Sequence, residues 1–194
     1  MIEYCIRGID PDKDFPAFDE RILRLPEWRR RSTLSYLAPV DRLQSALAWE
    51  MLAALLHKHF GIGADSFRIE YDSCGKPSVS SRPDLHISLA HCPCGVMAAV
   101  ADMPVGCDIE EIRHPYAEHG AIVARHYFTD AERRQIMTAA DSALEFTKIW
   151  TVKEAVFKLD NSLDLETLDT FHLPPVRLTT TSTPGYAATL ATLV

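Results

Sequence analysis

The sequence lacks several features that would place it in a specialised class of protein. No apolar run reaches the roughly 18 residues of a membrane span, so we expect a protein with no transmembrane segment. The first residues, 1–4, have neither the basic nor the apolar region of a secretory signal, which favours a cytoplasmic location. The formal net charge of −7 over 194 residues also argues against general nucleic-acid binding.

Cysteine is present, but not in a pattern that builds a disulfide framework or a zinc site. There are five cysteines, an odd number, and no two have Cys-x-x-Cys spacing: Cys5, Cys74, Cys92, Cys94 and Cys107. We therefore expect free thiols in a reducing compartment. A soft metal bound by Cys92 and Cys94 is an alternative that their spacing disfavours.

Enough apolar residues are present to build a folded core. Hydrophobic residues make up 47% of the chain and charged residues 24%, which is typical of globular rather than disordered proteins. A chain of this length can fold as one compact unit or as two small lobes.

Hydrophobic periodicity predicts two long helices, one in each half of the chain. Apolar residues recur at helical spacing over residues 41–60, and Gly61 follows as a C-terminal cap. A second long helix is predicted at 142–159, with five buried positions: Phe146, Ile149, Trp150, Val156 and Phe157. Just before it, Thr129 and Glu132 have the spacing of a capping box at a helix start.

Short stretches typical of strands follow each long helix. They cover residues 67–71, 85–89, 96–101, 105–109, 176–180 and 186–193. The order of a helix and then antiparallel strands therefore occurs twice, which predicts an α+β fold of two lobes. We expect residues 1–103 to form an N-terminal lobe and residues 104–194 a C-terminal lobe, without an internal repeat at the residue level.

Two carboxylates share one face of the predicted strand at 105–109 and its continuation. Residues two apart in a strand point the same way, so Asp108 and Glu110 face together while Ile109 faces the other side. Gly106 removes a side chain just before them, which allows a ligand or a backbone to come close. Taken alone, this pair is most simply an acidic strand end in solvent.

A carboxylate flanked by two lysines lies on the predicted helix at 142–159. Glu154 and Lys158 are four residues apart and share a helix face, and Lys153 directly precedes Glu154. Taken alone, Glu154 and Lys158 form a surface ion pair worth a few tenths of a kcal/mol. Together with the carboxylates of the strand, however, these residues supply hard oxygen ligands for Mg²⁺ and ammonium groups for phosphate oxygens.

Three segments carry these residues: Val105-Gly106-Cys107-Asp108-Ile109-Glu110, Phe128-Thr129-Asp130-Ala131-Glu132 and Trp150-Thr151-Val152-Lys153-Glu154-Ala155-Val156-Phe157-Lys158. In this order and spacing they resemble the signature of the 4′-phosphopantetheinyl transferase superfamily, of the two-lobed, surfactin-synthetase-activating type. The resemblance covers about residues 25–171. It implies two similar α+β lobes related by a pseudo-twofold axis, each with antiparallel strands packed on a long helix, and coenzyme A in the cleft between them.

The resemblance also implies roles at the metal and the phosphates. Asp108, Glu110 and Glu154 match the family's metal-binding carboxylates, and Glu154 is the implied general base, acting directly or through a metal-bound water. Lys158 matches a lysine that contacts the coenzyme A phosphates. Lys153 is expected to neutralise phosphate oxygens beside the metal.

At the nucleotide end, the resemblance implies a second group of contacts. Gly75-Lys76-Pro77 resembles an element whose lysine lies near the nucleotide, and His91 matches a histidine that contacts the 3′-phosphate. Taken alone, His91 would be a structural histidine.

Two positions depart from the family's pattern. Ala90 stands where a hydroxyl residue usually precedes the histidine, and Gln44 stands near the place of an arginine that grips the nucleotide phosphate. Either Arg42, half a turn away, takes over this role with a register shift, or the nucleotide is held by fewer contacts. The run Arg29-Arg30-Arg31 resembles the family's basic segment and could compensate, although such a run is as commonly a solvated face. These departures concern coenzyme A affinity more than catalysis.

The function implied is Mg²⁺-dependent transfer of the 4′-phosphopantetheine arm of coenzyme A to a serine of an apo acyl or peptidyl carrier protein. Two alternatives stay open: a non-catalytic carrier-binding homologue, and a metal-dependent phosphohydrolase using the same three carboxylates. The segment 114–128 is expected to receive the carrier through apolar residues, namely Tyr116, Ile122, Val123, Tyr127 and Phe128. We expect a monomer, because both lobes lie in one chain.

Overall fold

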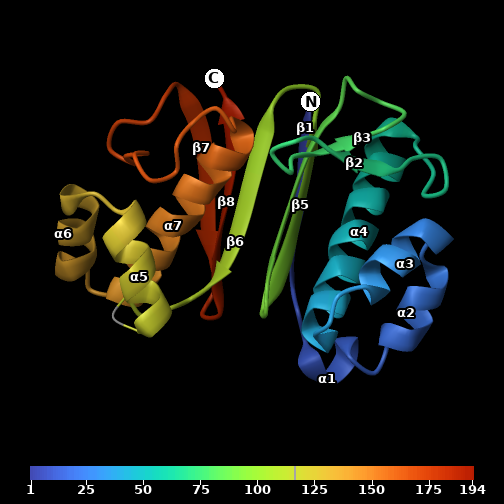
Figure 1. Ribbon diagram of the computed structural model, residues 1–194, viewed down its shortest axis with the longest axis horizontal. Helices are drawn as coiled ribbons and strands as arrows, with labels where there is room; N and C mark the ends of the chain where they lie inside the picture. Colours follow the sequence, from blue (N-terminus) through green and yellow to red (C-terminus); the bar gives the residue numbers. More distant parts are fainter. Residues whose placement is uncertain (116) are drawn as a thin grey trace.

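Two antiparallel β-sheets pack against each other at the centre of the molecule (Figure 1). The computed structural model describes residues 1–115 and 117–194. The first sheet has the strand order β1-β5-β4-β3-β2 and the second the order β6-β8-β7. The strands are β1 (Ile2–Gly8), β2 (Ile69–Tyr71), β3 (Pro77–Val79), β4 (His86–Cys92), β5 (Gly95–Ala101), β6 (Val105–Glu111), β7 (Val176–Ser182) and β8 (Tyr186–Leu193).

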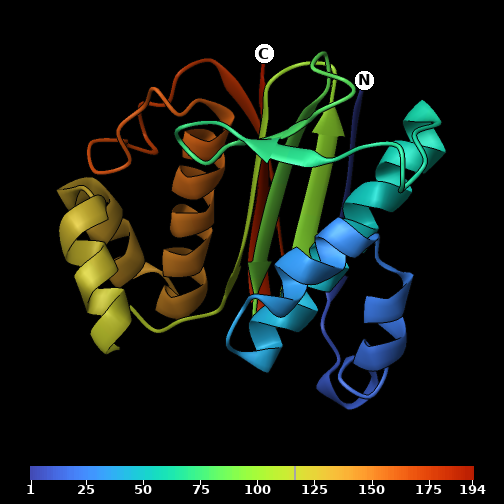
Figure 2. The same ribbon diagram turned by 45° about the vertical axis from the view of Figure 1, so that its right-hand side comes forward.

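One long helix covers the outer face of each sheet, which produces four layers in the order helix, sheet, sheet, helix (Figure 2). Helix α4 (Pro39–Phe60) packs on the first sheet and α7 (Ser142–Leu159) on the second. The shorter helices are α1 (Pro11–Asp14), α2 (Phe18–Arg24), α3 (Glu27–Leu34), α5 (Glu118–Tyr127) and α6 (Asp130–Thr138). The predicted α+β class with antiparallel strands is confirmed.

Local sequence signals explain where the long helices begin and end. Pro39 starts α4 because the first turn of a helix does not need the N–H that proline lacks. Gly61 ends it with a φ of 67°, a left-handed conformation that glycine adopts at little cost. Asp141 caps α7 by accepting a hydrogen bond from the backbone N–H of Leu144 at 3.0 Å.

The two sheets share an apolar core made largely of small side chains. It includes Ala90, Met97 and Ala99 from the first sheet and Val105, Cys107, Ile109, Ala188 and Leu190 from the second. Because side chains alternate along β6, residues 105, 107 and 109 enter this core and residues 106, 108 and 110 face α7. All of β5 is buried, since α4 covers one of its faces and the second sheet the other.

We retain residues 1–103 and 104–194 as the proposed N-terminal and C-terminal lobes, because the first sheet ends at Ala101 and the second begins at Val105. All five cysteines are free, as expected. In the part of the chain that the structure describes, no helix combines the length and the apolar character needed to cross a membrane.

Candidate active site

The carboxylates of β6 meet the charged face of α7 because Gly106 lets the helix lie directly on the strand. A Cβ atom at residue 106 would lie 2.0 Å from the carbonyl oxygen of Ala155 and 2.4 Å from the backbone nitrogen of Leu159. No side chain fits in that space, so the group that Gly106 admits is the backbone of α7. This contact brings the last turns of α7 over Asp108.

Lys158 is the cation at the centre of the site. Its Nζ donates to Asp108 Oδ1 at 2.6 Å and lies 3.8 Å from Glu154 Oε2. Burial disfavours the charge on Lys158, but attraction to Asp108 and Glu154 outweighs that cost and raises the pKa of the ammonium. Asp108 is only 4% exposed, and its second oxygen, Oδ2, is buried without a hydrogen-bond partner.

Burial makes all three predicted metal ligands reluctant to ionise. It raises the pKa of Asp108, although Lys158 opposes the shift. Burial and repulsion from Asp108 raise the pKa of Glu110 to about 7, against the attraction of Arg113, whose Nη2 lies 3.8 Å from Glu110 Oε2. Burial also raises the pKa of Glu154, with Lys158 opposing the rise and Asp108 adding to it. The site therefore contains three carboxyl groups with raised pKa values close to the cations Lys158 and Arg113.

These donors suit a hard divalent cation in their chemistry, but they are not arranged as a finished metal site. Mg²⁺ prefers carboxylate oxygens as ligands. The Oδ2 atom of Asp108 accepts no hydrogen bond, so it has lone pairs with which it could bind a cation. Among residues 1–115 and 117–194, however, no group of three His, Cys, Asp or Glu side chains has the geometry to hold a metal ion. Lys158 supplies the positive charge next to Asp108 in this arrangement.

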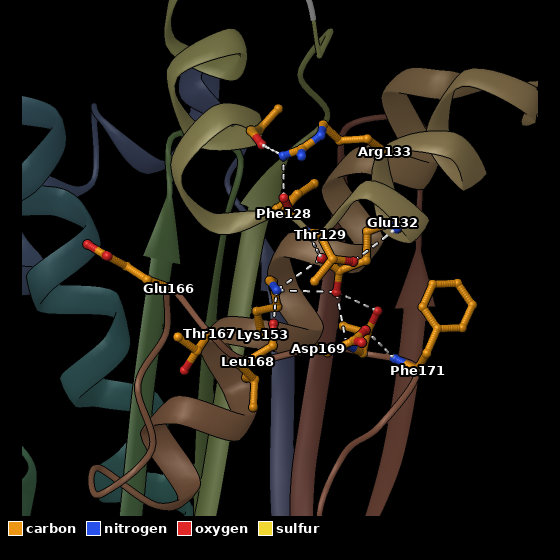
Figure 3. A network of polar contacts seen from close by, with 12 residues as sticks. Phe128, Thr129, Glu132, Arg133, Lys153, Glu166, Thr167, Leu168, Asp169 and Phe171 are labelled. Atoms are coloured by element: carbon orange, nitrogen blue, oxygen red, sulfur yellow. Dashed lines mark hydrogen bonds and ion pairs between the residues drawn. The ribbon is translucent and has the colours of Figure 1, made fainter.

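The prediction that Lys153 neutralises phosphate oxygens is wrong. Its side chain is 0% exposed, and Nζ donates to Glu132 at 3.0 and 3.2 Å and to the carbonyl oxygen of Leu168 (Figure 3). Consecutive residues of a helix point about 100° apart, so Lys153 faces α6 while Glu154 faces the site. The sequence identified Glu132 as a capping residue, which is confirmed, but not as the partner of Lys153.

Lys76 links the two proposed lobes. Its Nζ donates at 2.8 Å to the carbonyl oxygen of Leu159, at the end of α7. A cavity of about 190 Å³ lies beside this contact, lined by residues 74–77 and 87–89 of the first lobe and by Phe157, Lys158 and Asn161 of the second. The structure thus brings two of the predicted coenzyme-binding residues, Lys76 and Lys158, to one cavity between the first sheet and the end of α7.

His91 lies on β4, within electrostatic range of the site. Burial by neighbouring groups and then the charge of Lys158 lower the pKa of its imidazole, although part of the residue still reaches solvent. Its neighbour Ala90 points into the shared core, and the hydroxyl of Ser88 accepts a hydrogen bond from the backbone N–H of Cys107 at 2.9 Å. The hydroxyl of this segment therefore joins β4 to β6, a role that the sequence does not predict.

Gln44 and Arg42, the two residues near the expected place of the nucleotide-binding arginine, differ in their surroundings. Gln44 is buried at 3% exposure, whereas Arg42 is partly exposed and donates from Nε to the carbonyl oxygen of Tyr36 at 2.7 Å.

The first arginine of the run at 29–31 has a structural contact. Arg29 is buried and donates to the carbonyl and hydroxyl oxygens of Ser45 at 2.8 and 2.7 Å, so it holds α3 to α4. Arg31 is exposed and paired with Glu27. Of the three arginines at 29–31, only the second and third reach solvent.

Comparison with known proteins shows which family this site resembles. Residues 104–191 match the family model of the 4′-phosphopantetheinyl transferase superfamily. The matched part of the chain contains β6, the capping box and α7, and the resemblance drawn from the motifs is confirmed.

Individual relatives carry the same description at low identity. The chain is 29% identical over 122 residues to the 4′-phosphopantetheinyl transferase psf-1 of Bacillus pumilus, which covers 62% of this chain and 51% of that protein. It is 24% identical over 160 residues to the transferase gsp of Aneurinibacillus migulanus, covering 81% and 65%. It is 23% identical over 133 residues to the transferase Sfp of Bacillus subtilis, covering 68% and 58%. The chain thus spans about half to two thirds of the length of these relatives.

Proposed function

We propose that this protein transfers the 4′-phosphopantetheine arm of coenzyme A to a serine of an apo acyl or peptidyl carrier protein in a Mg²⁺-dependent reaction. The observation that carries the proposal is the group of Asp108, Glu110 and Glu154 around Lys158, beside a cavity between the first sheet and the end of α7. The names of the relatives support the reaction class.

The chemistry is a phosphoryl transfer between two oxygens. The serine hydroxyl forms a bond to the β-phosphorus of the coenzyme A pyrophosphate, the bond from that phosphorus to the bridging oxygen breaks, and adenosine 3′,5′-bisphosphate leaves. Such reactions depend on positioning the reactants and on neutralising charge on the phosphoryl oxygens. When bound, Mg²⁺ supplies Lewis-acid stabilisation of the pyrophosphate charge.

The residues of β6 and α7 would have different roles in this reaction. Asp108, Glu110 and Glu154 would hold the metal. Glu154 would also accept the serine proton, directly or through a water, and burial raises the pKa of this carboxylate above its ordinary value, toward that of a more effective base at neutral pH. Lys158, held in its charged form by its acidic neighbours, would neutralise the phosphoryl oxygens. Lys76, His91 and Arg42 are proposed to contact the nucleotide end.

The carrier is proposed to dock on the segment 114–128 and its neighbour α6. Ile122 is 53% exposed, whereas Val123 and Phe128 are buried in the core of this lobe, so only part of the predicted apolar set is free for docking. Tyr116 lies outside the described residues. A cavity of about 360 Å³ between α5 and α6, lined mainly by apolar groups such as Ala121, supports docking by hydrophobic contact.

One experiment tests the proposal against the two alternatives. The protein is incubated with coenzyme A, Mg²⁺ and an apo carrier, and the carrier is weighed by mass spectrometry, with a chelator as control. A gain equal to the phosphopantetheine arm on the carrier serine is the expected result. Cleavage of coenzyme A without a carrier would indicate a phosphohydrolase, and carrier binding without either reaction would indicate a non-catalytic homologue.

A further inference from the structure

A buried ion pair joins three segments on the side of α7 that faces away from β6 (Figure 3). Glu132 lies in the first turn of α6 and Lys153 in the second half of α7, and both side chains are 0% exposed. The third segment is the chain that follows α7, which contributes Leu168 and Thr170.

The polar atoms of this pair are well supplied with partners. Glu132 Oε1 accepts from the backbone N–H and the hydroxyl of Thr170, both at 2.8 Å, and Oε2 accepts from the backbone N–H of Thr129 at 2.8 Å. The ammonium of Lys153 donates to both carboxylate oxygens and to the carbonyl oxygen of Leu168. Its three hydrogens therefore have three acceptors, which leaves the side chain with one orientation.

A buried ion pair of this kind contributes little to the stability of the fold, but it can fix the relative positions of the segments that it joins. Desolvation offsets most of the attraction between two buried charges, so apolar residues of the same volume often stabilise a fold equally well. Removal of one partner, by contrast, leaves an uncompensated buried charge. Any movement of α7 that withdraws Lys153 from Glu132 is therefore strongly disfavoured.

We infer that Lys153 is a positioning residue, which together with Glu132 fixes the rotation of α7 about its axis and so the direction of Glu154. The inference rests on the proposed function of Glu154. Lys153 and Glu154 are consecutive, and a helix turns as one body, so a rotation that frees Lys153 also moves Glu154 and Lys158 relative to Asp108. Gly106 sets how closely α7 approaches β6, and Lys153 sets which face it presents.

Two variants test this inference. The double variant Lys153→Met/Glu132→Gln removes both charges at similar side-chain volume. The single variant Glu132→Asp keeps both charges but shortens the acidic side chain. We expect each folded variant to lose about tenfold or more in kcat, with the KM for coenzyme A within about twofold of wild type. Thr167→Val, which removes an exposed hydroxyl that donates to the carbonyl oxygen of Asp164 and leaves the ion pair and its partners in place, is the matched control and should keep kcat within about twofold.

A second measurement reports the rotation of α7 without turnover. Trp150 lies on α7 against Tyr127 and Phe128, whereas Trp28 and Trp49 lie in the first lobe. In protein labelled with fluorotryptophan, the ¹⁹F resonance of Trp150 should shift in both variants, while the other two tryptophan resonances stay in place.

The outcomes separate the inference from the proposed function. A folded variant with a wild-type kcat, or with an unshifted Trp150 resonance, would overturn the positioning role. If the double variant does not fold, the same two measurements on Glu132→Asp decide the question. If the wild-type protein transfers nothing to a carrier but the Trp150 resonance shifts, the proposed function fails and the rotational control of α7 stands.

Discussion

Asp108 is the residue whose environment argues most directly for a charged ligand. It is buried, its Oδ1 is bonded to Lys158, and its Oδ2 has no partner. A buried carboxylate oxygen without a partner destabilises the fold unless a ligand or cation binds to it. We therefore place Asp108 at the centre of the proposed metal site.

Asp108→Ala should lower kcat about 100-fold or more, which corresponds to about 2.7 kcal/mol of lost transition-state stabilisation. Added Mg²⁺ should restore activity only in part, since a ligand is missing. Steady-state rates against a carrier, with the exposed variant Thr167→Val as a control, provide the measurement. More than half of the wild-type rate at saturating Mg²⁺ would refute the carboxylate assignment.

Glu110 should make the metal-free protein less stable as the pH rises. Its pKa is raised from 4.5 to about 7 in the folded state, so the folded protein holds a proton between these values that the unfolded chain has released. The free energy of unfolding should therefore fall by roughly 3 kcal/mol from pH 4.5 to above pH 7. Denaturant titrations in the presence of chelator measure this.

Glu110→Gln should make that part of the pH profile less steep, because a neutral amide has no proton to lose, while Asp108 and Glu154 keep their own contributions. Saturating Mg²⁺ should flatten it in the wild-type protein as well, since a bound cation stabilises the ionised carboxylate. An unchanged slope in Glu110→Gln would assign the pH dependence to another group.

At the scale of the elements, the contact between β6 and α7 decides whether the site exists. The strand supplies two carboxylates and the helix supplies Glu154 and Lys158, but they meet only because Gly106 lets the two backbones touch. The periodicity of the sequence predicts both elements, and α7 has the bounds expected of it, Ser142–Leu159. The closeness of the contact depends on packing and is not visible in the pattern.

Gly106→Ala should separate the helix from the strand and damage both stability and activity. The added methyl group would lie 2.0 Å from the carbonyl oxygen of Ala155, and neither backbone can yield without moving the whole element. We expect a loss of about 2–4 kcal/mol in the free energy of unfolding.

Gly8→Ala is the matched control, because a Cβ there meets its nearest neighbours at 3.8 and 3.9 Å and the residue is also in a strand. Thermal unfolding of the two variants side by side makes the comparison. Equal stability of Gly106→Ala and Gly8→Ala would show that the contact between α7 and β6 is looser than described.

At the scale of the whole molecule, we expect charge and apolar surface to set how the two proposed substrates bind. The protein carries a formal charge of −7, so long-range attraction to an acidic carrier should be weak. The KM for the carrier should therefore change less than about threefold between about 50 and about 300 mM salt, because apolar contacts are insensitive to screening. Coenzyme A binding, which relies on ionic contacts, should weaken over this range.

Titration of both substrates at several salt concentrations tests this. A carrier KM that rises about tenfold with salt would contradict hydrophobic docking. It would instead indicate a basic surface, for which Arg30 and Arg31 are the candidates, since Arg29 is buried against Ser45.

Local patterns in the sequence were sufficient for the parts of this protein that depend on nearby residues. Helix periodicity, strand alternation and the capping box arise from interactions over a few residues, so α4, α7, β6 and the start of α6 can be predicted from the chain alone. The shared face of Asp108 and Glu110 follows from the same alternation.

Only the tertiary structure decided which face of an element meets which neighbour. No strand is predicted at residues 2–8, because β1 depends on pairing with β5, more than 85 residues away. The direction of Lys153 is not predicted either. Helix α7 is covered by β6 and β8 on one side and by α6 on another, so its periodicity does not tell which side a given lysine faces. Desolvation decides the direction of Lys153 in the folded protein, because a buried ammonium must lie where hydrogen-bond acceptors surround it.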